Sequence, residues 1–302
     1  MGIKNLSKLI KKHAPNGRVE YTSLESYRGQ TFAIDVPIFA YKFASVFRGD
    51  VLRGFKEQVE TLRDRFNITP IYVFDGDVSK AKEGEMQVRS EIKKRAHASL
   101  GQAKEELATA KRLKTSTGAI SLSALVAAED KLEKALKRVE YVPKKEDYKN
   151  AKDFFQQEKV MCHTAPNDAE KFCVQLVARG EADLVVSEDY DVLPYFCAHN
   201  RDASTCRMLT GLGKATMVEY TLGPILAQLG IAKAGFIDMC ILSGCDFCKH
   251  KIKNVASTRA LSMIQAHGTI ESILRVLDTR KFEVHELFAE EYALAREEFT
   301  RL

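Results

Sequence analysis

The sequence predicts an α/β fold in which helices cover both faces of a mostly parallel central sheet. Three apolar runs with the character of buried strands each end at an aspartate, at 31–35, 71–75 and 184–189. Helical patterns lie between these runs, and strands that alternate with helices are typical of parallel sheets. With 302 residues, of which 45% are hydrophobic, the chain is long enough to bury one sizeable core.

The remaining elements follow in chain order. A short apolar run at 160–162 predicts a fourth strand, whereas 80–157 has few strand signals and predicts two or three helices. In that stretch Leu132, Leu136 and Val139 recur at helical spacing, and Thr115–Gly118 interrupts the pattern, which suggests a helical arch that stands off the sheet. Further helices are expected at 225–242, 258–277 and 284–302. We therefore divide the chain into a first sheet part at 1–79, the arch insertion at 80–157, and a second sheet part with a C-terminal helical region at 158–302.

Basic residues concentrate in one segment of the chain. The net charge is +5, but between Val78 and Lys152 there are 18 Lys and Arg residues against 11 Asp and Glu. This asymmetry favours a polyanionic partner, although a solvated helical face would also explain it. Lys82, Arg89 and Lys93 are spaced by 7 and 4 residues, so that one face of one helix presents three cations.

Composition also limits where the protein is expected to work. No apolar run approaches the ~20 residues that cross a bilayer, and the N-terminus lacks the apolar core of a signal peptide. Seven cysteines, scattered from Cys162 to Cys248, indicate reduced thiols rather than a disulfide framework. We expect an intracellular protein with no membrane association, located in the nucleus of a eukaryotic cell or otherwise in the cytoplasm.

Acidic residues gather where the predicted strands end. In a parallel sheet the carboxyl ends of the strands share one edge, and ligands bind there. Carboxylates without accompanying His or Cys suit hard divalent cations, which predicts two Mg²⁺ ions with Mn²⁺ as a substitute. Two such ions can activate a water and stabilise the leaving oxygen of a phosphodiester, while Lys82 and Arg89 hold the same phosphate. The candidate ligands are Asp35, Asp75, Asp168, Glu170, Asp189, Asp191 and Asp246.

Each of these acids also has a purely structural interpretation. Asp35 or Asp75 alone is an ordinary strand-ending residue. Asn167 and Glu170 have the spacing of a helix capping box. The coincidence of four acidic strand ends favours a functional site over these separate explanations.

The motifs resemble one family over nearly the whole chain, the structure-specific 5′ nucleases and, within them, the flap endonucleases of the XPG-like group. The N-terminal sequence MGIKNL resembles the start of that family, where processing would leave Gly2 near the active site. Five acidic motifs match those of the family in order: Ala33–Val36, Val73–Gly76, Ala165–Glu170, Ser187–Asp191 and Leu242–Asp246. The resemblance implies a PIN-like 5′ nuclease fold.

The resemblance also implies roles for individual residues. The seven acids would be the metal ligands, and Lys82 and Arg89 would lie on the gateway helix and contact the scissile phosphate. Tyr41 matches the base-stacking tyrosine of the family. Further DNA contacts are expected from Gly2, Lys93, Lys251, Lys253 and Arg259.

Some positions depart from the family pattern. Asp168 stands where flap endonucleases usually have Glu, one methylene longer. The Gly-rich hairpin of the family's helix-two-turn-helix is replaced by Asn254–Ala256, so a K⁺ ion would have to be held there without it. No sliding-clamp motif is visible in the sequence.

The sequence therefore predicts a divalent-metal-dependent phosphodiesterase. We expect it to act as a 5′ flap endonuclease and 5′-3′ exonuclease on branched DNA with a 5′ single-stranded flap. The protein would act as a monomer in replication, repair or recombination. Two alternatives remain open at this point: a 5′-3′ exonuclease that acts on RNA, and a nucleic-acid-binding scaffold without catalysis. The complete set of acids counts against the scaffold.

Overall fold

The computed structural model describes residues 3–76, 83–117, 122–200 and 202–301, with the backbone alone at 83–90, 92, 93, 116, 117 and 138. The chain forms two compact units, each built from several segments. The sheet unit comprises residues 1–38, 58–82 and 155–302, and the hairpin unit comprises 39–57 and 83–154. The division at 79 and 157 stays a prediction.

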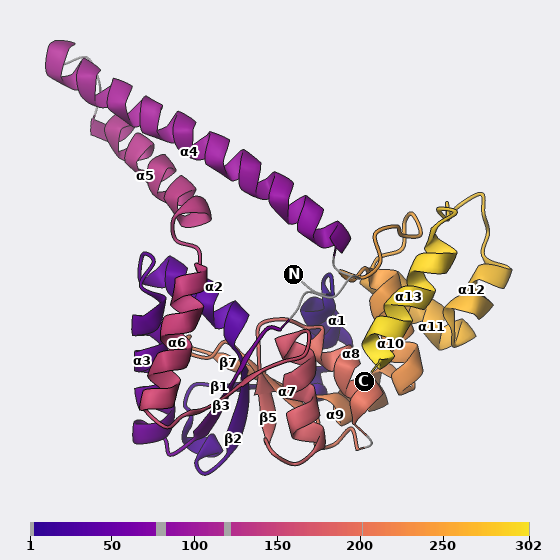
Figure 1. Cartoon of the computed structure of the whole chain (residues 1–302). Helices are drawn as coiled ribbons and strands as arrows, with labels where there is room; N and C mark the ends of the chain where they lie inside the picture. The colour runs from indigo at the N-terminus through magenta and orange to yellow at the C-terminus, as the bar shows by residue number, and fades with distance from the viewer. Residues whose placement is uncertain (1–2, 77–82, 118–121, 201, 302) are drawn as a thin grey trace. The chain divides into compact units, whose positions relative to one another are not determined.

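A seven-stranded sheet organises the sheet unit (Figure 1), with the order β1-β7-β6-β5-β2-β3-β4. Its centre is parallel: β2 pairs with β3 and β5, β3 pairs with β4, and β5 pairs with β6. This confirms the predicted parallel sheet. The parallel strands are β2 (Thr31–Asp35), β3 (Thr69–Phe74), β4 (Met161–Thr164), β5 (Leu184–Val186) and β6 (Arg207–Thr210).

An antiparallel edge completes the sheet and was not predicted. Strand β7 (Met217–Thr221) pairs antiparallel with β6, and β1 (Arg18–Tyr21) pairs antiparallel with β7. These strands are short and mix charged with apolar residues, so they show no clear period in the sequence.

Both faces of the sheet are covered, as the sequence predicts. On one face Ala33, Val73 and Val185 belong to the main hydrophobic core, against which α7 (Ala169–Ala178) packs. On the other face the Tyr72 ring stacks on Phe155 with 4.1 Å between centroids, and the Tyr72 hydroxyl donates to Gln58 at 3.0 Å. The remaining helices before β7 in this unit are α1 (Leu6–His13) and α8 (Val192–His199).

The C-terminal part of the sheet unit is helical. It consists of α9 (Leu222–Leu229), α10 (Lys233–Ser243), α11 (Ser257–His267), α12 (Ile270–Val276) and α13 (Phe288–Thr300). Arg296 on α13 links this helix to α10 and α12, because its guanidinium donates to both oxygens of the buried Asp238 at 2.8 Å and to Glu271 at 2.7 Å. The expected helices at 225–242 and 258–277 are each two shorter helices.

The hairpin unit is built around two long helices that lie side by side (Figure 1), α4 (Glu83–Thr117) and α5 (Leu122–Val139). Leu100, Ala103 and Ala135 form their shared apolar seam, and Lys131 pairs with Glu106 at 2.6 Å across it. The other helices that contribute to this unit are α2 (Val36–Val46), α3 (Val51–Val59), which continues as a π-helical turn at Glu60–Arg65, and α6 (Lys145–Gln157). The predicted helical insertion is therefore confirmed as three helices.

Within the described residues, no single helix is both long and apolar enough to cross a membrane. One bent pair, α9 with α10, passes by length and composition only, and its residues are largely buried in the fold.

Candidate functional site

The last residue of β2 anchors the site. Asp35 is 2% exposed, and its Oδ2 accepts a hydrogen bond from the Ser187 hydroxyl at 2.8 Å. The Ser187 hydroxyl oxygen in turn accepts the backbone N–H of Asp189 at 3.0 Å, so one serine links two of the predicted acids. The Oδ1 atom of Asp35 is buried and has no hydrogen-bond partner among the described residues. A buried carboxylate oxygen of this kind is costly unless a proton or a cation satisfies it.

Other acids surround this carboxyl. Burial is the main cause that raises the pKa of Asp35, and the negative charges of Glu170, Asp75 and Asp189 raise it further, against the opposing hydrogen bond from Ser187. The like charges can be close together only because the strand ends meet at one edge of the sheet.

Strand β3 brings Asp75 to the same edge. Its Oδ1 accepts the backbone N–H of Ala169 at 2.9 Å, the first residue of α7. The next residue, Gly76, donates its N–H to the carbonyl of Asn167 at 2.8 Å. A Cβ atom at Gly76 would lie 1.9 Å from the Ala165 carbonyl oxygen, so only glycine permits this close approach.

The N-terminus of α7 carries two more acids. Asp168 occupies the N-cap position without a side-chain capping bond, and Glu170 lies in the first turn. The capping box considered for Asn167 and Glu170 is therefore not formed. Both carboxylates lie where the helix dipole favours negative charge.

The turn after β5 supplies Asp189 and Asp191. The Asp191 N–H donates to Asp189 Oδ1 at 3.0 Å, and the Asp191 side chain is almost fully buried. The negative charges of Asp168, Asp191, Glu170 and Asp189 add to burial in raising the pKa of Tyr195. All four acids thus act electrostatically on the same phenol.

Asp246 lies in the loop after α10. The adjacent Cys245 is buried, and after burial the charge of Asp191 is the largest cause that raises the pKa of its thiol. We call the seven acids the acidic rim. Among the residues that the structure describes, no three acidic, histidine or cysteine side chains already converge in a coordination geometry. The rim has the donor type that a hard cation needs, but its side chains are not drawn together around one point.

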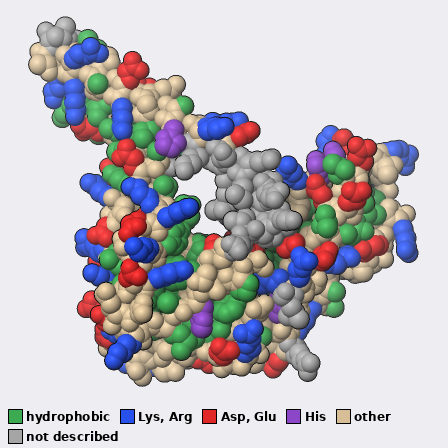
Figure 2. Space-filling model, viewed as in Figure 1, with side chains coloured by type: hydrophobic (Ala, Val, Ile, Leu, Met, Phe, Trp, Pro, Cys, Tyr) green, Lys and Arg blue, Asp and Glu red, His purple; other side chains and the backbone are tan. Residues whose placement is uncertain are grey.

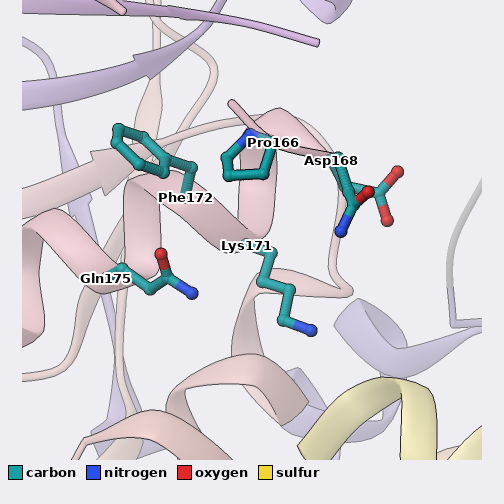
Figure 3. Close-up of a pocket in the computed structure, with 6 residues that line it drawn as sticks. Pro166, Asp168, Lys171, Phe172 and Gln175 are labelled. Carbon is teal, nitrogen blue, oxygen red and sulfur yellow. The ribbon is translucent and has the colours of Figure 1, made fainter. Parts of the chain in front are cut away.

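A small hollow of about 50 Å³ adjoins the rim at Asp168 (Figure 3). Lys171 and Phe172 line it, and the Lys171 side chain points toward α13, where its Nζ donates to the Glu298 carbonyl at 3.4 Å. Burial is the main cause that lowers the pKa of Lys171, while Glu298 and Asp168 oppose this shift. The hollow has room for little more than water.

Three of the predicted DNA contacts lie in the C-terminal part of the sheet unit, at Lys251, Lys253 and Arg259. Lys251 packs against Gly244, and burial and the neighbouring Lys4 lower the pKa of its ammonium. Lys253 is exposed and pairs with Glu283 at 2.9 Å. Arg259 donates to the Asn254 carbonyl and lies 5.5 Å from the centre of the Phe282 ring.

The other predicted contacts are placed less fully. Tyr41 lies on α2, in the hairpin unit, and is 54% exposed. A tyrosine that stacks on a base needs an exposed ring. Lys82 and Gly2 lie outside the described residues, and so do the side chains of Arg89 and Lys93. Their roles stay predictions.

Sequence reasoning missed some residues that build the site. Ser187 and Gly76 stand inside the quoted acidic motifs, yet their contacts depend on the approach of distant segments. The sequence feature that could have identified both residues is their position close to an acid in these motifs. Lys4 and Lys171 gave no local signal, since their neighbours come from distant parts of the chain.

Comparison with known proteins places the chain in a family. The XPG N-terminal domain model matches residues 1–96, and the XPG I-region model matches residues 159–246. The chain is 31% identical to flap endonuclease 1 of Homo sapiens over 314 residues, covering 96% of this chain and 75% of that protein.

Solved structures agree on the fold. The catalytic core of Rad2 in complex with a DNA substrate has a TM-score of 0.65 at 16% identity, covering 99% of this chain and 85% of that one. The Holliday junction-resolving enzyme GEN1 in complex with product DNA and Mg²⁺ ion has a TM-score of 0.59 at 19% identity, covering 99% and 64%. Because the sequence identity extends over most of both chains and both XPG models match, the chain belongs to the flap endonuclease family of XPG-type nucleases.

Proposed function

We propose that the protein is a divalent-metal-dependent 5′ nuclease that cuts branched DNA near the base of a 5′ single-stranded flap. The acidic rim carries this proposal. The negative charges of Glu170, Asp75 and Asp189 act on the Asp35 carboxyl, and one oxygen of that carboxyl is buried without a hydrogen-bond partner among the described residues. Membership of the flap endonuclease family supports the substrate class. The solved GEN1 complex contains Mg²⁺, which supports this ion as the natural cofactor.

The residues present suit such ions. All seven rim side chains offer carboxylate oxygens, which hard cations prefer to nitrogen or sulfur. The charges of Glu170, Asp75 and Asp189 raise the pKa of Asp35, so we propose that these four acids hold the metal most directly. When bound, divalent ions supply an activated water for attack on phosphorus and charge stabilisation at the leaving 3′ oxygen.

The chain's own groups supply the remaining requirements. The hydrogen bonds from Ser187 to Asp35 and from Ala169 to Asp75 fix the orientation of two carboxyls before a substrate binds. Lys82 and Arg89 are proposed to oppose the negative charge that develops on the scissile phosphate. Lys251 packs against Gly244, and the Lys4 N–H donates to the Gly244 carbonyl at 3.2 Å. We propose that both lysines neutralise neighbouring phosphates.

Cleavage of end-labelled substrates tests the proposal. The panel comprises 5′-flap, nicked and single-stranded substrates in DNA and RNA versions, each with Mg²⁺ and with EDTA. We expect cleavage of 5′-flap DNA near the junction with Mg²⁺ and none with EDTA. Preference for single-stranded RNA would favour the exonuclease alternative, and binding without cleavage under every condition would favour the scaffold.

Three further properties are part of the proposal. We propose that Mn²⁺ substitutes for Mg²⁺, that the protein acts as a monomer on branched DNA, and that it works inside the cell. Light scattering during size-exclusion chromatography, with and without flap DNA, measures the oligomeric state.

A further inference from the structure

Helix α13 buries one stripe of side chains in the core of the sheet unit. Phe288, Ala295 and Phe299 are at most 1% exposed, and their spacing of 7 and 4 residues places them on one face of the helix. The other side of the helix exposes Glu290 and Glu297, and Figure 2 shows acidic side chains on the surface over the C-terminal helices. Within this stripe, Phe299 lies in the last turn, and its ring contacts lead to the acidic rim.

The Phe299 ring makes two contacts with other aromatic rings, both edge to face. Its centre lies 5.4 Å from that of the Tyr195 ring at an interplanar angle of 65°, and 5.1 Å from that of the Phe247 ring at 88°. All three side chains are buried. The energy of an edge-to-face pair depends on the relative orientation of the two rings, so such pairs restrict orientation as well as distance. A shorter side chain at this position would leave a gap between the two partner rings.

Each partner ring belongs to a segment that carries an acid of the rim. Phe247 directly follows Asp246 in the chain. Tyr195 lies in the first turn of α8, and its backbone N–H donates to the Asp191 carbonyl at 3.2 Å. The Phe299 ring therefore bridges two segments that are far apart in the sequence and that each supply a rim carboxylate.

The backbone of the same helical turn is tied to α7 and α8. The last carbonyls of a helix have no hydrogen-bond partner within the helix. The Lys171 Nζ donates to the Glu298 carbonyl at 3.4 Å, and His199, at the end of α8, hydrogen-bonds to the Phe299 backbone. Lys171 directly follows Glu170, a rim acid in the first turn of α7. The end of α13 thus connects α7, α8 and the loop after α10.

This connection matters because the rim acids come from separate segments of the chain. Among the described side chains, no three metal-ligating groups already converge around one point, so the carboxylates must be drawn together when a cation binds. Mg²⁺ demands a nearly ideal octahedral arrangement of its ligands. Segments that are held in place before binding lower the cost of gathering these ligands. A residue that fixes the segments relative to one another therefore contributes to the affinity for metal.

We propose that Phe299 is a positioning residue of the acidic rim. Through Tyr195 it holds the turn of Asp191 in place. Through Phe247 it holds the loop of Asp246 in place. The proposal rests on the proposed function in that the rim is taken to bind divalent cations. It gives α13, a helix that supplies no acid to the rim, a share in the affinity for metal.

Direct measurement of Mn²⁺ binding without DNA tests this role, because it does not depend on cleavage. The electron paramagnetic resonance signal of free Mn²⁺ gives the Kd of the full chain. Phe299→Ala removes the bridging ring. Phe288→Ala is the matched control, because Phe288 is also buried on the same face of α13 but packs its ring on Tyr292, 5.5 Å between centres. All titrations are made at a temperature at which circular dichroism shows each variant to be folded.

For Phe299→Ala we expect the affinity for Mn²⁺ to fall roughly tenfold, as it does when residues that orient metal ligands are replaced. Phe288→Ala should change this affinity less than about twofold. The melting temperatures in EDTA should fall by similar amounts in both variants, roughly 5–15 °C, because each loses a buried ring. The difference in metal affinity then separates positioning from stability.

A milder pair of variants covers the case in which the alanine variants do not fold. Phe299→Leu fills part of the space without an aromatic edge, so it should lose Mn²⁺ affinity roughly threefold, while Phe288→Leu should leave it unchanged. In single-turnover cleavage of 5′-flap DNA, Phe299→Leu should need roughly threefold more Mg²⁺ for half of its maximal rate. Its rate at saturating Mg²⁺ should stay within about twofold of wild type.

Equal changes of Mn²⁺ affinity at positions 299 and 288 would overturn the proposal, since they would assign the effect to a general loss of stability. Wild-type affinity in Phe299→Ala would refute this role alone. Absence of Mn²⁺ binding by the wild-type protein would refute both the metal site and this role. Mn²⁺ binding that depends on Phe299, together with failure of the cleavage panel, would refute only the proposed nuclease activity.

Discussion

Asp35 shows how a single residue is kept at a cost to stability. Its carboxylate is buried beside other negative charges, and one of its oxygens lacks a hydrogen-bond partner among the described residues. A residue selected for stability alone would not be acidic at this place. Under the proposed function, binding of a cation would relieve this cost and would account for the carboxylate at the end of an otherwise apolar strand.

Replacing this charge tests the explanation. Asp35→Asn keeps the side-chain shape and an oxygen that can accept from Ser187, but it removes the buried charge. We expect the metal-free free energy of unfolding to rise by about 1 kcal/mol, or roughly 2–4 °C in melting temperature, measured in EDTA by circular dichroism. The variant should also lose most of the stabilisation that wild-type protein gains from Mg²⁺.

Asp202→Asn is the matched control. Asp202 is exposed and accepts hydrogen bonds from Ser204, which lower the pKa of its carboxyl, so its replacement should not stabilise the protein. A lower melting temperature of Asp35→Asn in EDTA would contradict the account of the buried charge.

The strand ends show which elements the sequence could predict. The runs that became β2, β3 and β5 are apolar and end within three residues of an acid, so the strands could be predicted from the sequence, and the role of their acids stays a prediction. Strands β1 and β7 were not, because pairing at the antiparallel edge is decided by distant partners such as Arg18 and Tyr220. Likewise the acids could be listed from the sequence, but the contacts of Gly76 and Ser187 depend on how separate segments approach one another.

The close contact between the end of β3 and the segment before α7 depends on Gly76. Gly76→Ala places a methyl group against the Ala165 carbonyl, and backbone atoms cannot move aside as a flexible side chain can. We expect a loss of roughly 1–3 kcal/mol in the free energy of unfolding, together with a loss of cleavage, because Asp75 is displaced from Ala169.

The control glycine lies in α4. A Cβ at Gly101 would meet nothing within 4 Å, and Gly101→Ala should stabilise the helix by about 0.5–1 kcal/mol without reducing cleavage. Chemical denaturation and single-turnover cleavage measure both effects. Wild-type cleavage by Gly76→Ala would show that the close approach does not position the rim.

The ion-pair network of Arg296 anchors helix α13. Arg296→Met leaves the buried Asp238 without its guanidinium partner, which should cost about 3–5 kcal/mol at pH 7. Burial already raises the pKa of Asp238 above its usual 3.8, and loss of Arg296 raises it further. Because the protonated carboxyl tolerates burial, the penalty is present at pH 7 and should decrease as the pH falls toward this raised pKa.

Urea denaturation of both proteins at pH 7 and pH 5 measures this difference. Asp238→Asn/Arg296→Met should recover much of the loss, since it removes the unpaired charge. Arg296 also lowers the pKa of Glu271 to about 2, so that this carboxyl stabilises the wild-type fold above pH 4.5 and loses its effect as the pH falls from there toward 2. A penalty for Arg296→Met that is the same at both pH values would refute the role of Asp238.

At the scale of the whole molecule, opposite charges are separated between the two units. The sheet unit holds the acidic rim, and the hairpin unit holds most of the basic excess that the sequence shows between residues 78 and 152. A nuclease needs both, because metal binding requires negative charge and binding of nucleic acid requires positive charge. The sequence revealed this division of charge.

The most direct test of the central claim compares cleavage with binding in one variant. Asp189→Asn removes a rim carboxylate but leaves the DNA-binding cations in place. In single-turnover experiments with saturating Mg²⁺ and end-labelled 5′-flap DNA, we expect this variant to show no cleavage above background, while its affinity for the same DNA in EDTA stays within a few-fold of wild type. Cleavage by Asp189→Asn at a near wild-type rate would contradict the assignment of the acidic rim as the catalytic metal site.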